Sequence, residues 1–225
     1  NTDPDLAFLT NFLETLLMRV WYPISVATTS FGIKRLVKKY AEKTGGNMFL
    51  QFHLNDFGSR GVSSKESAGL GGSAHLINFW GTDTLEGILY AMKYYNAPVC
   101  GYSVAASEHS ATIVYGEENE SLAYKSFMEA YPNGLISIVS DSYDLYNAVE
   151  NIFGKELRSM ILEREGKLVV RPDSGYPPQV TFQVLKSLWK HFGGTINDKG
   201  YKVLNPKVRV IYGDYIKYGM IDDIL

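Results

Sequence analysis

The chain has 225 residues, of which 45% are hydrophobic and 20% are charged, so it can bury one sizeable core. Its 22 basic and 24 acidic residues give a formal net charge of -2, which removes any broad electrostatic reason to expect a nucleic acid or an anionic membrane as partner. A single cysteine, Cys100, excludes an internal disulfide framework and a cysteine-rich metal site, and we therefore expect a cytoplasmic location.

The two ends of the sequence resemble cuts within a longer protein. The chain begins Asn1-Thr2-Asp3 without an initiator methionine, and it stops at Leu225 inside a helical pattern. No apolar stretch is long enough to cross a bilayer. We expect a fragment of a protein that has no membrane partner.

The first part of the chain is predicted to be helical. Apolar residues recur at three- and four-residue steps from Leu6 to Val20, which indicates an amphipathic helix that ends at Trp21-Tyr22-Pro23. A second helix is expected from about Thr29 to Lys43, because Gly45-Gly46 follows it.

Two shorter helices are expected next. Ser63-Ser64-Lys65-Glu66 resembles a capping box before the small-residue stretch Ser67 to Ala74, which favours a closely packed helix. Another helix is expected to start near Thr82-Asp83-Thr84 and to run to Tyr95.

Beyond Tyr131 the pattern changes to short β-branched runs, each of which ends in an acidic turn. Amphipathic helices are expected between these runs, and the turn-rich segment from Gly193 to Leu204 is typical of a hairpin. Alternation of strand, helix and strand indicates βαβ units with parallel strands. The expected strands are residues 136–139, 168–170 and 208–211, and the expected helices are 145–161 and 180–192.

The acidic turns contain Asp141, Asp173 and Asp214. Because parallel strands share a direction, we expect these three carboxylates on one rim, which in a β/α barrel is the rim that carries the chemistry. The alternative is that each aspartate merely caps the helix that follows it. The pattern thus predicts an α/β enzyme with a barrel-like core.

Several short motifs occur along the chain in a fixed order and spacing. These are Trp21-Tyr22-Pro23-Ile24, Asp56-Phe57-Gly58-Ser59-Arg60-Gly61, Gly81-Thr82-Asp83-Thr84, Gly101-Tyr102-Ser103-Val104, Glu108-His109-Ser110, Ser140-Asp141-Ser142 and Arg171-Pro172-Asp173-Ser174-Gly175. Each motif is weak alone, but through their order and spacing the sequence resembles the nicotinamide phosphoribosyltransferase family, of the type II phosphoribosyltransferases, over nearly its whole length.

The resemblance implies a fold, a reaction and a division of the chain. The implied fold is part of an irregular β/α barrel, with a helical segment at residues 1–50 before the barrel portion at residues 51–225. The implied reaction joins nicotinamide to 5-phosphoribosyl 1-pyrophosphate, releases pyrophosphate and belongs to NAD salvage. It also implies a phosphate-binding glycine-rich loop beyond Leu225 and an N-terminal aromatic residue from a partner subunit. We therefore expect this chain alone to be incomplete for catalysis.

The implied nicotinamide pocket includes Phe57 as a stacking wall and Arg60 as a phosphate ligand. Asp83 would accept a hydrogen bond from the carboxamide nitrogen and repel the carboxylate of nicotinate. The alternatives are a core phenylalanine beside a surface arginine, and an Asp83 that caps a helix. Ser103, Val104 and Ser137 would line the tunnel that admits nicotinamide.

The implied catalytic residues are His109, Glu108 and Asp141. His109 matches the histidine that the family phosphorylates with ATP, and Glu108 and Asp141 are candidates for orienting its ring. Arg171 would contact the phosphate or ribose of the substrate. Gly213 would lie in the substrate site, and Asp173 and Asp214 would accept hydrogen bonds from the ribose hydroxyls.

The remaining expectations concern cofactors, partners and rival functions. Mg2+ is expected to bind mainly through the pyrophosphate, without a direct protein ligand, and ATP is an optional phosphoryl donor. The resemblance implies a homodimer with the active site at the subunit interface. The alternatives are a nicotinate phosphoribosyltransferase and a non-catalytic binding module. All site residues are expected to face one common cavity.

Overall fold

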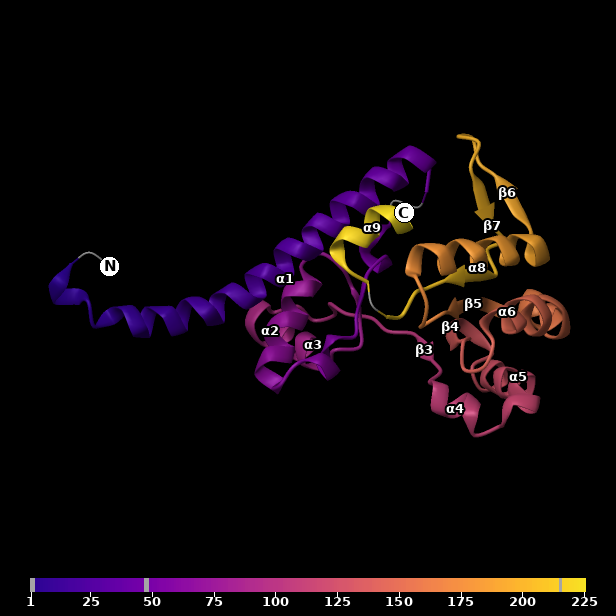
Figure 1. Ribbon diagram of the computed structural model, residues 1–225, viewed down its shortest axis with the longest axis horizontal. Helices are drawn as coiled ribbons and strands as arrows, with labels where there is room; N and C mark the ends of the chain where they lie inside the picture. The colour runs from indigo at the N-terminus through magenta and orange to yellow at the C-terminus, as the bar shows by residue number, and fades with distance from the viewer. Residues whose placement is uncertain (1–2, 47–48, 215) are drawn as a thin grey trace. The chain divides into compact units, whose positions relative to one another are not determined.

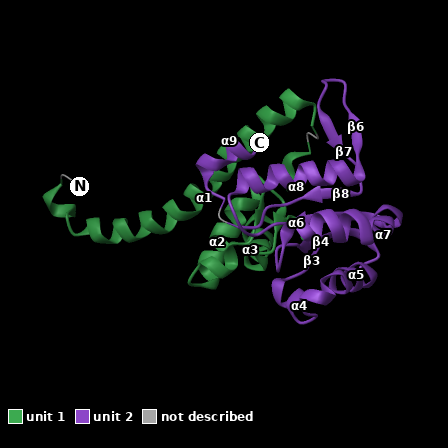
Figure 2. Ribbon diagram, turned by 45° about the vertical axis from the view of Figure 1, so that its right-hand side comes forward, with its two compact units in different colours: residues 1–103 green, residues 104–225 purple. Residues whose placement is uncertain are grey.

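The protein is described here by a computed structural model that covers residues 3–46, 49–214 and 216–225. The chain forms two compact units, residues 1–103 and 104–225 (Figure 2). The predicted boundary between residues 50 and 51 lies inside the first unit. The predicted division into a helical segment and a barrel portion refers to a complete barrel, so it stays a prediction.

The first unit begins with the 3-10 helix η1 (Pro4–Leu6) and one long helix, α1 (Leu9–Thr44), which Figure 1 shows as uninterrupted. The predicted break at Trp21-Tyr22-Pro23 is wrong. Pro23 lies inside the helix, where it removes one backbone donor, but helix-forming residues flank it on both sides. The helix ends where Gly45 adopts a left-handed φ of 72°, as predicted.

Helices α2 (Lys65–Leu76) and α3 (Leu85–Tyr95) form the packed part of the first unit together with the second half of α1. Gly72 and Gly87 face each other so closely that a Cβ on Gly72 would come 2.8 Å from the Gly87 Cα. The predicted close packing of the small-residue helix is confirmed. Its cap lies one residue later than predicted, because Ser64 accepts a hydrogen bond from the Ser67 backbone nitrogen at 3.1 Å.

Two short parallel strands, β1 (Asn55–Asp56) and β2 (Gly81–Thr82), complete the first unit. Asn55 pairs with Gly81 and Asp56 pairs with Thr82. The 3-10 helices η2 (Leu50–Phe52) and η3 (Gly58–Gly61) flank β1. The sequence pattern did not predict these strands, because two residues are too few to show alternation.

The second unit is built on a parallel sheet with the strand order β3-β4-β5-β8. The strands are β3 (Ala105–Ala106), β4 (Asn133–Val139), β5 (Glu165–Arg171) and β8 (Val208–Val210). Ile136, Leu168 and Val208 stand side by side in the register, and all three are fully buried in the main core. The α/β fold class is confirmed, and so are the three predicted strands.

Helices connect the strands of this sheet. They are α4 (His109–Ile113), η4 (Glu117–Asn119), α5 (Glu120–Ala130), α6 (Leu145–Asn147), η5 (Ala148–Glu156), α7 (Arg158–Glu163) and α8 (Pro177–Phe192). Two further helices, η6 (Tyr218–Met220) and α9 (Ile221–Ile224), follow β8. The predicted hairpin is also present, as the antiparallel pair β6 (Gly194–Ile196) and β7 (Lys202–Leu204).

The predicted helix between β4 and β5 is more irregular than its apolar pattern indicates. Its central part, η5, is a π-helix, flanked by the short α-helices α6 and α7. The buried residues Val149, Ile152 and Phe153 still face the core, so the apolar face survives the change of helix type. Parallel strands joined by helices are the repeating unit of a β/α barrel, and the barrel itself stays a prediction.

Candidate active site

The first unit contains a pocket of about 300 Å³ that is lined by Phe57, Ser59, Arg60 and Asp83. The parallel pair β1 and β2 creates it, because Phe57 directly follows β1 and Asp83 directly follows β2. The Asp83 backbone nitrogen donates to the Asp56 carbonyl at 2.9 Å, which holds the two strand ends together. Three residues predicted to share a ligand therefore line one pocket, with an aromatic ring, a cation and a carboxylate.

The Asp83 carboxylate is not used as a helix cap. The N-cap residue of α3 is Thr84, and no side chain makes a capping hydrogen bond there. Instead, Asp83 Oδ1 accepts a hydrogen bond from the Ser103 hydroxyl. The capping alternative for Asp83 is therefore wrong, and a second predicted site residue, Ser103, contacts this carboxylate.

The second unit collects acidic residues at the carboxyl ends of β4, β5 and β8. Asp141 follows β4 and Asp173 follows β5, and the strands are adjacent and parallel. The turns after the three strands are in contact, because the Asp173 backbone nitrogen donates to Asp141 Oδ2 at 2.9 Å and the Gly213 backbone nitrogen donates to the Pro172 carbonyl at 3.1 Å. The rim predicted from the sequence is therefore present.

None of these three aspartates caps the helix that follows it. Asp144 caps α6, accepting from the backbone nitrogens of Tyr146 and Asn147, while Tyr176 and Lys217 occupy the cap positions of α8 and η6. The capping alternative is wrong for the acidic rim as well.

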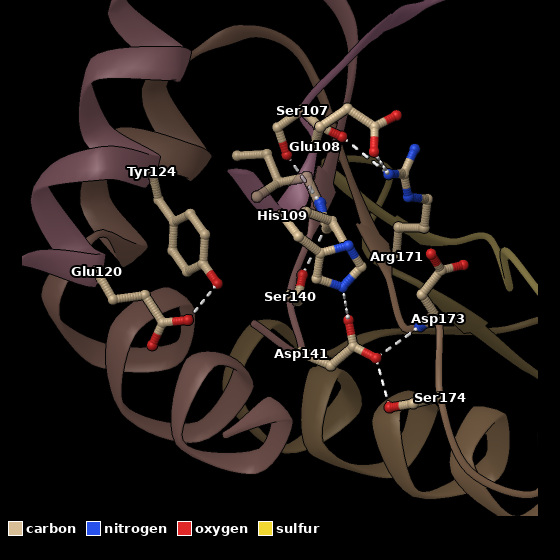
Figure 3. Close-up of polar contacts among 12 residues, drawn as sticks. Ser107, Glu108, His109, Glu120, Tyr124, Ser140, Asp141, Arg171, Asp173 and Ser174 are labelled. Atoms are coloured by element: carbon tan, nitrogen blue, oxygen red, sulfur yellow. Dashed lines mark hydrogen bonds and ion pairs between the residues drawn. The ribbon is translucent and has the colours of Figure 1, made fainter. Parts of the chain in front are cut away.

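His109 and Asp141 form the central contact of this rim (Figure 3). His109 begins α4, and its Nε2 lies 3.1 Å from Asp141 Oδ1. The Asp141 side chain is only 5% exposed, whereas that of His109 is 37% exposed. Because an ionised carboxylate only accepts hydrogen bonds, the imidazole proton lies on Nε2, and the lone pair of the neutral ring lies on Nδ1. This arrangement can present a nucleophilic ring nitrogen to an incoming group.

The other oxygen of Asp141 is bound by the turn after β5. Asp141 Oδ2 accepts from the Asp173 backbone nitrogen at 2.9 Å and from the Ser174 hydroxyl at 2.5 Å, as Figure 3 shows. Ser174 was not singled out from the sequence as a site residue. It stands in the Arg171–Gly175 motif, which was the available signal.

Arg171 lies at the end of β5 with its side chain 9% exposed. Its Nη2 donates to the Ser107 carbonyl at 2.8 Å and lies 3.8 Å from Glu108 Oε2. Its buried Nε has no hydrogen-bond partner within the part of the chain that the structure describes. Glu108 therefore contacts Arg171, while the contact with the His109 ring is made by Asp141. Ser107 is a further residue that the sequence did not indicate.

Asp173 is partly buried, and burial is the largest cause that raises its pKa above the ordinary value. The positive charge of Arg171 is the main cause that opposes this rise. Gly213 lies directly against Asp173, since a Cβ at position 213 would come 2.0 Å from Asp173 Oδ1. The Gly213 backbone nitrogen also donates to the Pro172 carbonyl at 3.1 Å. Glycine at this position therefore lets the loops after β5 and β8 meet.

Two further predicted site residues, Ser137 and Val104, make no side-chain hydrogen bond within the part of the chain that the structure describes that would assign them a role. Ser137 lies within β4, is 2% exposed, and its hydroxyl has no partner among the described residues. Val104 is exposed and directly precedes β3. Phe57, Arg60, Asp83 and Ser103 belong to the first unit, and the other site residues belong to the second. Their common cavity therefore stays a prediction.

The described residues, numbers 3–46, 49–214 and 216–225, include no group of three or more histidine, cysteine, aspartate or glutamate side chains arranged to hold a metal ion. Among the same residues, no helix combines the length and the apolar character that a transmembrane span requires.

Residues 52–225 match the model of the nicotinate phosphoribosyltransferase (NAPRTase) family. Three curated relatives carry the name nicotinamide phosphoribosyltransferase. The protein of Xanthomonas campestris pv. campestris is 47% identical over 220 residues, which are 96% of this chain and 47% of the relative. The protein of Mycoplasma pneumoniae is 38% identical over 99% of this chain and 50% of the relative. The protein of Acinetobacter baylyi is 39% identical over 100% of this chain and 49% of the relative. The chain spans about half the length of these relatives.

Proposed function

The chain belongs to the nicotinate phosphoribosyltransferase family, and we propose that the protein is a nicotinamide phosphoribosyltransferase that acts in NAD salvage. In this reaction the pyridine nitrogen of nicotinamide bonds to C1 of 5-phosphoribosyl 1-pyrophosphate, and the bond from C1 to pyrophosphate breaks. The products are nicotinamide mononucleotide and pyrophosphate. The observation that carries the proposal is the pocket that Phe57, Arg60 and Asp83 line together.

The charge of Asp83 supports nicotinamide over nicotinate. A carboxylate accepts hydrogen bonds from the carboxamide NH2 group, whereas it repels the carboxylate of nicotinate. The ring of Phe57 provides a face on which the pyridine stacks, which contributes about 1 kcal/mol beyond the burial of area. Arg60 provides a planar donor set for a phosphate oxygen.

We assign the ribose and its leaving group to the acidic rim. Asp173 and Asp214 accept hydrogen bonds from the two ribose hydroxyls, and Gly213 leaves room between them. The ribose becomes oxocarbenium-like as pyrophosphate departs, and the carboxylates stabilise that charge. The Nε of Arg171 is buried without a hydrogen-bond partner among the described residues, and it is assigned as a donor to a phosphate oxygen. Mg2+ would be held by pyrophosphate oxygens and water, and it would neutralise charge on the leaving group.

His109 is proposed as an acceptor of the γ-phosphoryl group of ATP. The Asp141 contact leaves the lone pair on Nδ1, so Nδ1 attacks phosphorus while the bond to the ADP oxygen breaks. Phosphohistidine would place negative charge near the pyrophosphate site, and through Mg2+ this charge would tighten substrate binding or shift the equilibrium toward product.

We further propose a cytoplasmic homodimer whose active site lies at the subunit interface. Support for an interface comes from the first half of α1, which carries exposed apolar side chains such as Phe12, Leu17 and Trp21.

Turnover by the full-length protein tests the proposal. Nicotinamide mononucleotide and pyrophosphate should form in equal amounts from nicotinamide, 5-phosphoribosyl 1-pyrophosphate and Mg2+. A kcat/KM for nicotinate equal to or above that for nicotinamide would make the protein a nicotinate enzyme. Binding of nicotinamide without turnover of either base would make it a non-catalytic binding module.

A further inference from the structure

One carboxylate, that of Asp141, connects the histidine to the turn after β5. Its Oδ1 faces His109 Nε2 at 3.1 Å, and its Oδ2 accepts from the Asp173 backbone nitrogen and the Ser174 hydroxyl. Figure 3 shows the two oxygens directed to opposite sides, one toward the imidazole and one toward Ser174. The orientation of the carboxylate therefore depends on both sets of contacts.

Within the described residues, the Ser174 hydroxyl is the only side-chain donor that contacts Asp141 Oδ2. At 2.5 Å it has the short length of a hydrogen bond to an ionised oxygen, which is stronger than a neutral one. Without it, Oδ2 keeps the Asp173 nitrogen alone, and the carboxylate can rotate about its Cβ–Cγ bond. Rotation would turn Oδ1 away from His109.

We propose that Ser174 is a positioning residue that fixes Asp141 and thereby keeps the imidazole proton on Nε2 of His109. The inference rests on the proposed function in one respect, namely that His109 accepts a phosphoryl group. Ser174 itself touches neither the ring nor the transferred group.

Three acidic residues lie near His109, and Asp141 is the one whose carboxylate contacts the ring and therefore selects the tautomer. Glu108, the preceding residue, has its carboxylate 3.8 Å from Arg171. Asp173, from the turn after β5, interacts with His109 through charge and binds Asp141 through its backbone nitrogen.

The first measurement is spectroscopic and needs no catalysis. In 15N-labelled full-length protein, the His109 Nε2–H signal should be visible in the wild type because the hydrogen bond to Asp141 slows its exchange. Ser174→Ala should lose this signal, and Ser174→Thr, which keeps a hydroxyl, should retain it. Ser159→Ala, which removes an exposed hydroxyl on α7, is the matched control and should resemble the wild type.

The second measurement is the rate at which ATP labels His109. Ser174→Ala should slow labelling about tenfold, as expected when a hydrogen bond to a charged group is lost, and Ser174→Thr should restore most of the rate. An unchanged Nε2–H signal in Ser174→Ala would overturn the proposal. Absence of labelling in the wild type would instead refute phosphorylation of His109, while the spectroscopic result would still decide the role of Ser174.

Discussion

At the scale of residues, the proposed chemistry depends on individual carboxylate side chains. Asp83 shows this in the first unit, because its carboxylate contacts Ser103 and lines the pocket with Phe57, while α3 is capped at another residue. A side chain that a helix does not need for its own stability is available for a ligand. Its replacement should therefore affect substrate choice more than folding.

Asp83→Asn should lower kcat/KM for nicotinamide about tenfold, because a neutral amide oxygen is a weaker acceptor than a carboxylate, and it should reduce the preference for nicotinamide over nicotinate. Steady-state kinetics with both bases measures this, and the melting temperature should stay close to that of the wild type. Asp144→Ala is the matched control, since Asp144 does cap a helix and its loss should cost about 1 kcal/mol of stability without altering base preference. Equal losses of activity and stability in Asp83→Asn would assign Asp83 a structural role.

His109→Asn should abolish stimulation of synthesis by ATP and leave basal synthesis in place, because the ribose-binding carboxylates are untouched. Rates with and without ATP, together with a phosphohistidine assay, measure the effect. His53→Asn, which changes an exposed histidine outside the acidic rim, should keep the stimulation. Persistent stimulation in His109→Asn would require another phosphoryl acceptor.

Sequence patterns identified Asp141 and Asp173, because they follow apolar runs in acidic turns. The same patterns did not identify Ser174 or Ser107. Ser174 acts through its hydroxyl on a residue 33 positions earlier, and Ser107 presents a backbone carbonyl to Arg171. Serine is common in turns, so its type alone does not distinguish these roles.

At the scale of elements, periodicity predicted β4, β5, β8 and several of the helices, but it predicted neither the two-residue strands β1, β2 and β3 nor helix type and helix continuity. Strands β4, β5 and β8 are marked by β-branched residues, and α8 by an apolar face. The break at Pro23 was expected because proline lacks a donor, yet one lost hydrogen bond does not end a helix of 36 residues. The π-helix η5 was not predicted, because its apolar residues recur at steps that also fit an α-helix.

One such contact joins η5 to α8. Glu150 Oε2 accepts from Lys190 Nζ at 2.6 Å and lies 2.7 Å from His191 Nε2. The His191 ring lies against Gly154, where a Cβ would come 2.7 Å from its Cγ. Lys190 and His191 of α8 thus contact Glu150, and His191 also packs against Gly154.

This contact predicts a defined acid sensitivity. Hydrogen bonds from His191, and then from Lys190, lower the pKa of Glu150 from 4.5 to about 2. Because the folded state lowers this pKa, the stabilisation is complete above pH 4.5 and is lost as the pH falls toward about 2.

Glu150→Gln should reduce the free energy of unfolding at pH 7 by up to about 1 kcal/mol, the range for solvent-screened ion pairs. The difference from the wild type should shrink as the pH falls below 4.5. Urea denaturation across this range measures it, with Glu156→Gln, an exposed position on η5, as control. A difference that stays constant with pH would mean that the charge of Glu150 does not contribute.

At the scale of the whole molecule, the first half of α1 exposes many large apolar side chains within the described residues. Phe12 is 72% exposed and Trp21 is 63% exposed, and many apolar neighbours around the helix are exposed as well. A set of large apolar side chains exposed along one helix normally marks a surface that binds another protein. These residues therefore support the proposed subunit interface, although their pattern alone predicted an ordinary amphipathic helix.

The double variant Phe12→Glu and Trp21→Glu should convert the full-length dimer into monomers, because two charges would have to be buried in an apolar contact. Sedimentation velocity measures the change. Leu122→Glu, on the exposed side of α5, is the control and should leave the dimer intact. A dimer that withstands the double variant would place the subunit contact elsewhere.

Because Asp141 is shared between the imidazole and the turn that contains Asp173, events on its two sides are thermodynamically linked. A ligand that draws Asp173 or Ser174 away from the carboxylate changes the free energy of phosphorylating His109. By reciprocity, phosphorylation must change the affinity for that ligand by the same factor. Measuring either quantity would therefore give the other.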